Sequence, residues 1–260
     1  MKSKKLISII FFLIFFNVTY LSSKEEFIFK VTEIEILDDG NLYRGLKGAN
    51  ATTIDENISI TADTIEYDKS KNILIAIGNV VLKDKIKNYL IKSNHITYFK
   101  NDEKIFSKDA TKAFIENKYE IFSSDVKLDN ITNIINTNKK TKIIDDNFNQ
   151  YESDTLYYLI NENIFKGQNV RIISNIDKEY VEKEYYNFKD GIFNLKNKEF
   201  VASDTKFFLK KNSFDVLEND PRIYANSSKK ISNITKFKKS IFTSCKISGD
   251  CPPWSILSEE

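Results

Sequence analysis

Short apolar segments alternate with polar turns along most of the chain. Between about residues 55 and 210, Ile, Val, Phe and Tyr tend to occupy every second position, and groups of Asp, Asn and Lys interrupt them. A two-residue period is typical of β-strands, whereas an amphipathic helix would repeat every 3.6 residues. The pattern therefore predicts an all-β protein built from antiparallel strands and polar turns.

A six-residue motif recurs in these segments. It reads small residue, Asp or Asn, any residue, Ile or Leu, any residue, Tyr, with copies at 62–67, 93–98 and 153–158. Degenerate copies start near Ser124 and Lys189, so the repeat is about 30 residues long. A second extended segment follows each anchor, at 72–82, 104–115, 163–173 and 198–209. Each repeat is thus predicted to be two strands joined by a turn.

The apolar positions change parity in the middle of successive segments. Ile60 and Ala62 share one parity, and Ile65 and Tyr67 share the other. A flat strand keeps its parity, so a change at the same place in successive strands indicates a bulge or corner. We expect stacked strands that bend together into a V-shaped β-jellyroll with its apolar face inside. The same reasoning expects a switch from Ile73, Ile75 and Ile77 to Val80 and Leu82.

The inward positions line a candidate apolar trough. From periodicity alone, a core filled by its own side chains is the more common arrangement, and a trough left open for an apolar ligand is the alternative. The candidate ligand-facing residues are Ile60, Ile65, Tyr67, Ile75, Ile77, Val80, Leu82, Ile91, Ile96, Tyr98, Leu156, Tyr158, Phe165, Val170 and Ile172.

Two stretches resemble a known family. Residues 60–68 followed by 72–80 resemble the opening repeat of the OstA-like β-jellyroll of lipopolysaccharide-transport proteins. The tail from Ile241 to Cys245, with the prolines and Trp254, resembles the junction that closes this jellyroll before the barrel of the outer-membrane assembly protein LptD. That barrel would lie beyond residue 260, so the chain is expected to be a fragment, the product of a split gene or a stand-alone domain. The resemblance implies a non-catalytic protein that binds the acyl chains of lipid A and passes lipopolysaccharide to the outer-membrane translocon.

The first strand is a candidate docking edge. An open edge leaves unpaired N–H and C=O groups that another strand can join. The resemblance implies that the periplasmic bridge protein LptA adds its strand here, and that the lipoprotein LptE is a partner if the barrel is present. The apolar residues of this strand, about 27–37, are Phe27, Phe29, Val31, Ile34 and Ile36.

The N-terminus is typical of an exported protein. Lys2, Lys4 and Lys5 precede an apolar run at 6–16, which is short for a membrane span and typical of a signal peptide. An uncleaved anchor is the alternative. The expected organisation is a signal peptide at 1–23, a jellyroll domain at 24–240 and a junction at 241–260, located in the periplasm at the outer membrane.

The two cysteines leave three arrangements open. Cys245 and Cys251 can pair with each other in an oxidising compartment or remain free thiols. The resemblance implies a third arrangement, in which they pair with a distant partner beyond the chain. With His95 as the only histidine, they do not supply a zinc site, and no metal or cofactor is expected.

Composition and charge exclude several function classes. A net charge of +2 from 39 basic and 37 acidic residues gives no overall field that would attract nucleic acid. Asp63, Asp125 and Asp154 recur periodically, which favours a turn-forming role over a catalytic pair. A carbohydrate-active β-solenoid enzyme would need a cluster of unique carboxylates, and none is evident. The competing hypothesis is a structural β-repeat protein, such as an adhesin or surface segment, with a closed core.

Overall fold

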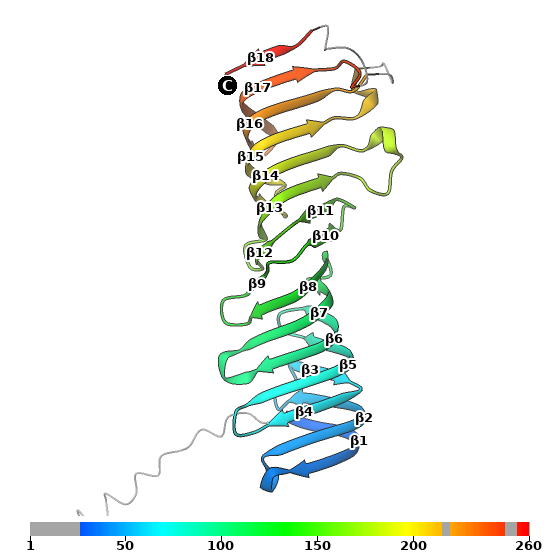
Figure 1. Ribbon diagram of the computed structural model, residues 1–260, viewed down its shortest axis with the longest axis vertical. Helices are drawn as coiled ribbons and strands as arrows, with labels where there is room; N and C mark the ends of the chain where they lie inside the picture. The colour runs from blue at the N-terminus through cyan, green and yellow to red at the C-terminus, as the bar shows by residue number, and fades with distance from the viewer. Residues whose placement is uncertain (1–26, 215–218, 248–253, 260) are drawn as a thin grey trace, which may run out of the picture.

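The protein folds as one continuous antiparallel sheet. The computed structural model describes residues 27–214, 219–247 and 254–259. Within these ranges an 18-stranded sheet forms, and every strand pairing is antiparallel. Figure 1 shows the strands stacked along the long axis, from the blue β1 at one end to the red β18 at the other. The all-β, stacked antiparallel fold expected from the repeats is confirmed.

The strands are β1 (Phe27–Leu37), β2 (Leu42–Thr53), β3 (Ile58–Ala62), β4 (Thr64–Asp68), β5 (Ile73–Asp84), β6 (Tyr89–Phe99), β7 (Lys104–Ile115), β8 (Tyr119–Asp129), β9 (Ile134–Thr137), β10 (Thr141–Asp145), β11 (Gln150–Ser153), β12 (Leu156–Leu159), β13 (Ile164–Ile173), β14 (Tyr185–Asn194), β15 (Glu199–Phe208), β16 (Arg222–Ile231), β17 (Ile234–Thr243) and β18 (Ile256–Ser258). The 3-10 turns are η1 (Asp38–Gly40), η2 (Lys100–Asp102), η3 (Tyr180–Glu182) and η4 (Lys211–Phe214). Across the described part of the chain, no helix is long and apolar enough to cross a membrane.

Each level of the stack, which we call a rung, consists of one long strand or two short successive strands and bends at a corner. The pairing register shifts between Val31 and Glu33 in β1, and comparable shifts occur in β5, β6 and β7. At other rungs the chain leaves strand geometry at the corner, which separates β3 from β4, β9 from β10 and β11 from β12. Bulges of this kind bend a strand while its neighbours stay paired. Each rung therefore has two arms, and their apolar faces meet inside the bend.

Recurring carboxylates join neighbouring rungs at the corner. Asp63, Asp125 and Asp154 all lie on this line, as their periodic recurrence suggested. The donors to them are, in chain order, the side-chain amide of Asn79 (3.0 Å), the backbone N–H of Asp109 (3.1 Å) and the side-chain amide of Asn169 (2.7 Å). All three donor residues have positive φ, which Asn and Asp tolerate better than most residues. These carboxylates are structural.

One predicted parity switch is wrong. The buried positions of β5 are Leu74, Ala76, Val80, Leu82 and Asp84, which all share one parity. Two residues with positive φ, Gly78 and Asn79, lie opposite a single residue of β6, so the apolar face continues without a switch. Ile75 and Ile77 therefore lie on the outer face, where Ile77 is 43% exposed. All the other candidate inward residues, from Ile60 to Ile172, are buried.

Candidate functional site: the interior of the bent sheet

The interior is closed over the N-terminal half of the stack. Ile60, Ile65, Leu82 and Ile96 are fully buried, and Ile91 is nearly so. The arms here pack against each other without a solvent-accessible gap at these side chains. The closed arrangement expected from periodicity is therefore what these rungs adopt.

The hydroxyl groups of the repeated tyrosines hydrogen-bond to the turns that follow them. Tyr67, Tyr98 and Tyr158 are at most 1% exposed, and each hydroxyl donates to a residue five positions later. The acceptors are, in chain order, Asn72 Oδ1 (3.0 Å), Glu103 Oε2 (2.7 Å) and Asn163 Oδ1 (3.2 Å). Each acceptor has a left-handed backbone. Burial raises the pKa of Tyr98 and Tyr158, which keeps the phenols protonated as donors. The interval from tyrosine to the turn residue was visible in the sequence, although the hydrogen bond was not predicted.

An aromatic cluster fills the interior of the C-terminal half. Phe188 on one arm lies 5.2 Å from Phe193 and 5.3 Å from Phe200 on the other arm, measured between ring centroids. Phe207 continues the cluster at 5.7 Å from Phe188. Most of these pairs are tilted or edge-to-face, which the charge distribution of the rings favours. The full cluster is Phe165, Tyr186, Phe188, Phe193, Phe200, Phe207 and Phe237.

Two glycines allow rings to lie against the backbone. A Cβ atom at Gly191 would lie 2.4 Å from the Phe193 ring, and one at Gly167 would lie 2.7 Å from the Phe165 ring. Any larger residue would displace these rings. The two glycines pair with each other across β13 and β14, so both rings cover the same part of the sheet.

A cavity of about 200 Å³ opens within this cluster. Its apolar wall is formed by Ile172, Phe188, Phe193, Phe200 and Phe207, with the ring of Tyr186 beside them. Ligand pockets commonly measure roughly 300–1,000 Å³, so this cavity holds part of an acyl chain as it stands. A whole chain requires the two arms to move apart.

Cations lie at the polar side of the cavity. Lys198 and Lys230 both line it. The Lys198 ammonium pairs with the carboxylate of Asp145 and lies 3.5 Å from the Tyr151 hydroxyl, which donates to Asp145 at 3.1 Å. Burial opposes ionisation of Asp145, but the Lys198 ammonium and the Asn149 amide outweigh it and lower the pKa of this carboxyl. The site therefore combines an apolar wall with a polar side, where Lys198 and Lys230 lie near the carboxylates of Asp145 and Glu199.

The predicted site residues are divided between the two halves. Ile172 lines the cavity, Phe165 belongs to the aromatic cluster and Val170 is buried on the same strand. Leu156 and Tyr158 are buried on β12. The others belong to the closed rungs or, for Ile75 and Ile77, to the outer face. The main cavity residues were missed, although the Phe-rich stretch at 188–208 carries them. Within the described ranges, no group of three His, Cys, Asp or Glu side chains could hold a metal ion.

The first strand lies at one end of the stack. β1 spans the predicted residues and pairs with β2, and it has no second strand partner among the residues described. Ile34 and Ile36 are 46% and 59% exposed, because no further rung of the part of the chain that the structure describes covers the inner face at this end. Among the described residues, this edge of β1 is therefore unpaired. That a partner docks there stays a prediction.

Several terminal predictions fall outside the described residues. The signal peptide at 1–23 and Cys251 both lie there. Cys245 is half-buried and has no disulfide partner in the described ranges, so its pairing stays open. β17 runs across the predicted domain boundary at residue 240 and pairs with β18, which places part of the expected junction within the sheet.

The chain is distantly similar to proteins of known structure. No model of a protein family matches the chain, and no curated protein does. A solved structure of LptH, the LptA-homologous periplasmic component of the lipopolysaccharide transport device of Pseudomonas aeruginosa, is 15% identical. The similarity covers 44% of this chain and 82% of that chain, with a TM-score of 0.40. This likeness is too distant to assign a family or a function to the chain.

Proposed function

We propose that the protein is a non-catalytic carrier of lipopolysaccharide. The observation that carries the proposal is the interior cavity, with its aromatic wall and with Lys198 and Lys230 at its polar side. The resemblance of residues 60–80 to the OstA-like repeat supports the same class of ligand. Acyl chains of lipid A enter between the arms, and the anionic head group stays beside the cations.

Burial of the acyl chains supplies the binding energy. Each methylene removed from water contributes about 0.8 kcal/mol, so even a partly inserted chain is held. Hydrogen bonds from an ammonium to a phosphate oxygen are stronger than those between neutral groups. No bond is made or broken, and directional movement requires energy from elsewhere in the transport path.

The proposed setting follows from the open edge of β1. The periplasmic bridge protein LptA adds a strand at this edge, lipopolysaccharide passes along the stack towards the outer membrane, and LptE takes part if a barrel is present. The protein would act in the periplasm at the outer membrane.

Filling the cavity tests the proposal. Thr235 lines it from β17, whereas the next residue, Lys236, points outward and is exposed. Thr235→Trp should weaken binding of fluorescently labelled lipopolysaccharide about tenfold or more, because the indole occupies the space of the acyl chain. Lys236→Trp should leave the affinity within about twofold. Equal affinity of both variants would contradict binding in the cavity.

A second candidate is a structural β-repeat protein. The closed rungs from β3 to β8 favour it, since a stack that serves only to hold its shape needs no cavity. This function predicts no saturable lipopolysaccharide binding by the wild-type protein, and the same titration distinguishes it.

A further inference from the structure

A row of cations crosses the outer face of one arm. Residues that lie opposite each other on neighbouring strands point to the same face of the sheet. Neighbouring strands are about 4.8 Å apart, so successive partners form a line of side chains along the long axis. Positive side chains recur on this line at every rung or every second rung. In spatial order the residues are Lys92, Lys112, Phe122, Lys142, Glu152 and Arg171.

Phenyl rings hold these ammonium groups in place. Lys112 Nζ and Lys142 Nζ lie 4.8 Å and 4.5 Å from the centroid of the Phe122 ring. A cation over a ring is stabilised there and still carries its charge and N–H donors. Lys112 also pairs with Glu120. The charges of the row are thus ordered before any ligand arrives.

Three hollows join along this row. The first, about 620 Å³, contains Lys92 and Lys112, and the second, about 590 Å³, contains Lys142 and Arg171. They share Phe122. The second shares Arg171 with a third hollow of about 520 Å³. We call the three together the basic groove.

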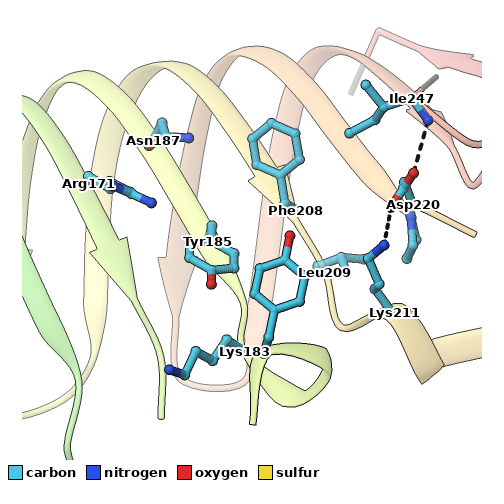
Figure 2. A pocket seen from close by; sticks show the side chains of 11 residues that line it. Arg171, Lys183, Tyr185, Asn187, Phe208, Leu209, Lys211, Asp220 and Ile247 are labelled. Atoms are coloured by element: carbon cyan, nitrogen blue, oxygen red, sulfur yellow. Dashed lines mark hydrogen bonds and ion pairs between the residues drawn. The ribbon is translucent and has the colours of Figure 1, made fainter. Parts of the chain in front are cut away.

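The third hollow adds aromatic surface to the positive charge. Figure 2 shows Arg171 and Lys183 on either side of Tyr185, with Lys211 paired to Asp220 at 3.1 Å. The Arg171 guanidinium lies 5.5 Å from the centre of the Tyr185 ring. Tyr180, which also lines the hollow, is 65% exposed. Exposed tyrosines offer both an apolar face and a hydrogen-bonding hydroxyl, which suits the C–H face and hydroxyls of a sugar.

The outer face of the other arm differs. The register there aligns Tyr157, Lys166, Ile192, Val201, Lys229 and Lys236. Tyr157, Ile192 and Val201 are 39%, 48% and 53% exposed, and they line a hollow whose one cation is Lys166. The chain as a whole has a net charge of only +2. The basic groove therefore differs from the outer face of the other arm not in the number of its cations but in joining them, along one line of hollows, to Tyr180 and Tyr185.

We propose that the basic groove binds an extended acidic polysaccharide that lies across the strands. Its carboxylate or phosphate groups would contact Lys92, Lys142 and Arg171, and its sugar rings would contact Tyr180 and Tyr185. Cations one or two rungs apart are spaced by roughly 5–10 Å. Glu152 within the row pairs with Arg171 at 3.9 Å. This site is separate from the interior cavity and does not rest on the carrier function.

A matched pair of triple variants tests the proposal in the full chain. Lys92→Gln/Lys142→Gln/Arg171→Gln removes three charges from the basic groove. The control, Lys166→Gln/Lys229→Gln/Lys236→Gln, removes three from the aligned outer row of the other arm. The probe is a fluorescent polygalacturonate oligosaccharide, measured by anisotropy, with dextran and single-stranded DNA as comparison polymers.

The groove variant should lose about tenfold or more in affinity for polygalacturonate, and the control less than about twofold. Binding should weaken with salt, and dextran should not compete. Equal losses in both variants, absence of binding by the wild type, or tighter binding of DNA would overturn the proposal. Both variants should keep the circular dichroism spectrum of the wild type and its affinity for lipopolysaccharide, which separates this test from that of the cavity.

Discussion

Removing one ring from the aromatic cluster should destabilise the C-terminal half strongly. Phe188 is 3% exposed and lies within 5.7 Å of Phe193, Phe200 and Phe207, measured between ring centroids. A buried Phe→Ala substitution costs about 3–5 kcal/mol of unfolding free energy through lost transfer energy and the cavity that remains. Each of the three ring pairs contributes about 0.5–1.5 kcal/mol beyond burial. We therefore expect Phe188→Ala to lie in the upper part of that range.

Urea unfolding followed by far-ultraviolet circular dichroism measures the effect. With a slope of about 2 kcal/mol per molar urea, the midpoint should fall by on the order of 2 M. Val201→Ala is the control, because this outer-face side chain is 53% exposed and its loss should cost no more than about 0.5 kcal/mol. A loss below about 1 kcal/mol for Phe188→Ala would show that the two arms do not pack through these rings.

Three further predictions address the turns, the buried ion pair and the edge. Tyr158→Phe removes the hydrogen bond to Asn163 and should lower the free energy of unfolding, measured in urea, by about 0.5–1.5 kcal/mol. An unchanged midpoint would show that the hydroxyl does not stabilise the hairpin. Because the pKa of Asp145 is lowered in the folded state, its stabilising effect is present above the unfolded value near 3.9 and is lost as pH falls through the lower folded value. Wild-type stability should therefore fall more steeply than that of Asp145→Asn below about pH 4, and parallel pH profiles would refute the pairing with Lys198. Phe29→Pro should prevent a purified bridge protein from docking at β1 while lipopolysaccharide affinity is kept; docking that persists would place the interface elsewhere.

The bend of the sheet could be predicted because the corner residues have distinctive chemistry. Asp63 and Asp154 recur at the interval of the repeat, and the Asn residues that bond to them tolerate positive φ. The change of parity around them reports which face is buried. Both signals are local, so a single sequence contains them.

The inward face of β5 could not be predicted in the same way. Ile73 to Ile77 is apolar on both faces, so alternation does not distinguish inside from outside. The face is decided by pairing, since Ile65 lies opposite Ala76 and Tyr67 lies opposite Leu74. These are contacts between separate strands, which periodicity within one strand does not report.

The cavity could not be predicted from the sequence either, because it is formed by contacts between residues on different strands and on both arms. Phe188 and Phe200 belong to different strands and meet only because both arms fold over the same interior. The stretch that carries them has a weak copy of the repeat motif, so its parity was hard to assign. The basic groove was hidden for a similar reason, because its cations are dispersed in sequence and become aligned through strand register.

Photo-crosslinking at two adjacent residues tests the central claim most directly. Phe200 lines the interior cavity, and Val201, the next residue, lies on the outer face. A photoreactive amino acid at either position is activated in the presence of lipopolysaccharide, and adducts are detected by a shift in electrophoresis. The carrier function predicts adducts at position 200 and none at 201. Adducts at both positions or at neither, in a correctly folded protein, would contradict an interior that receives acyl chains.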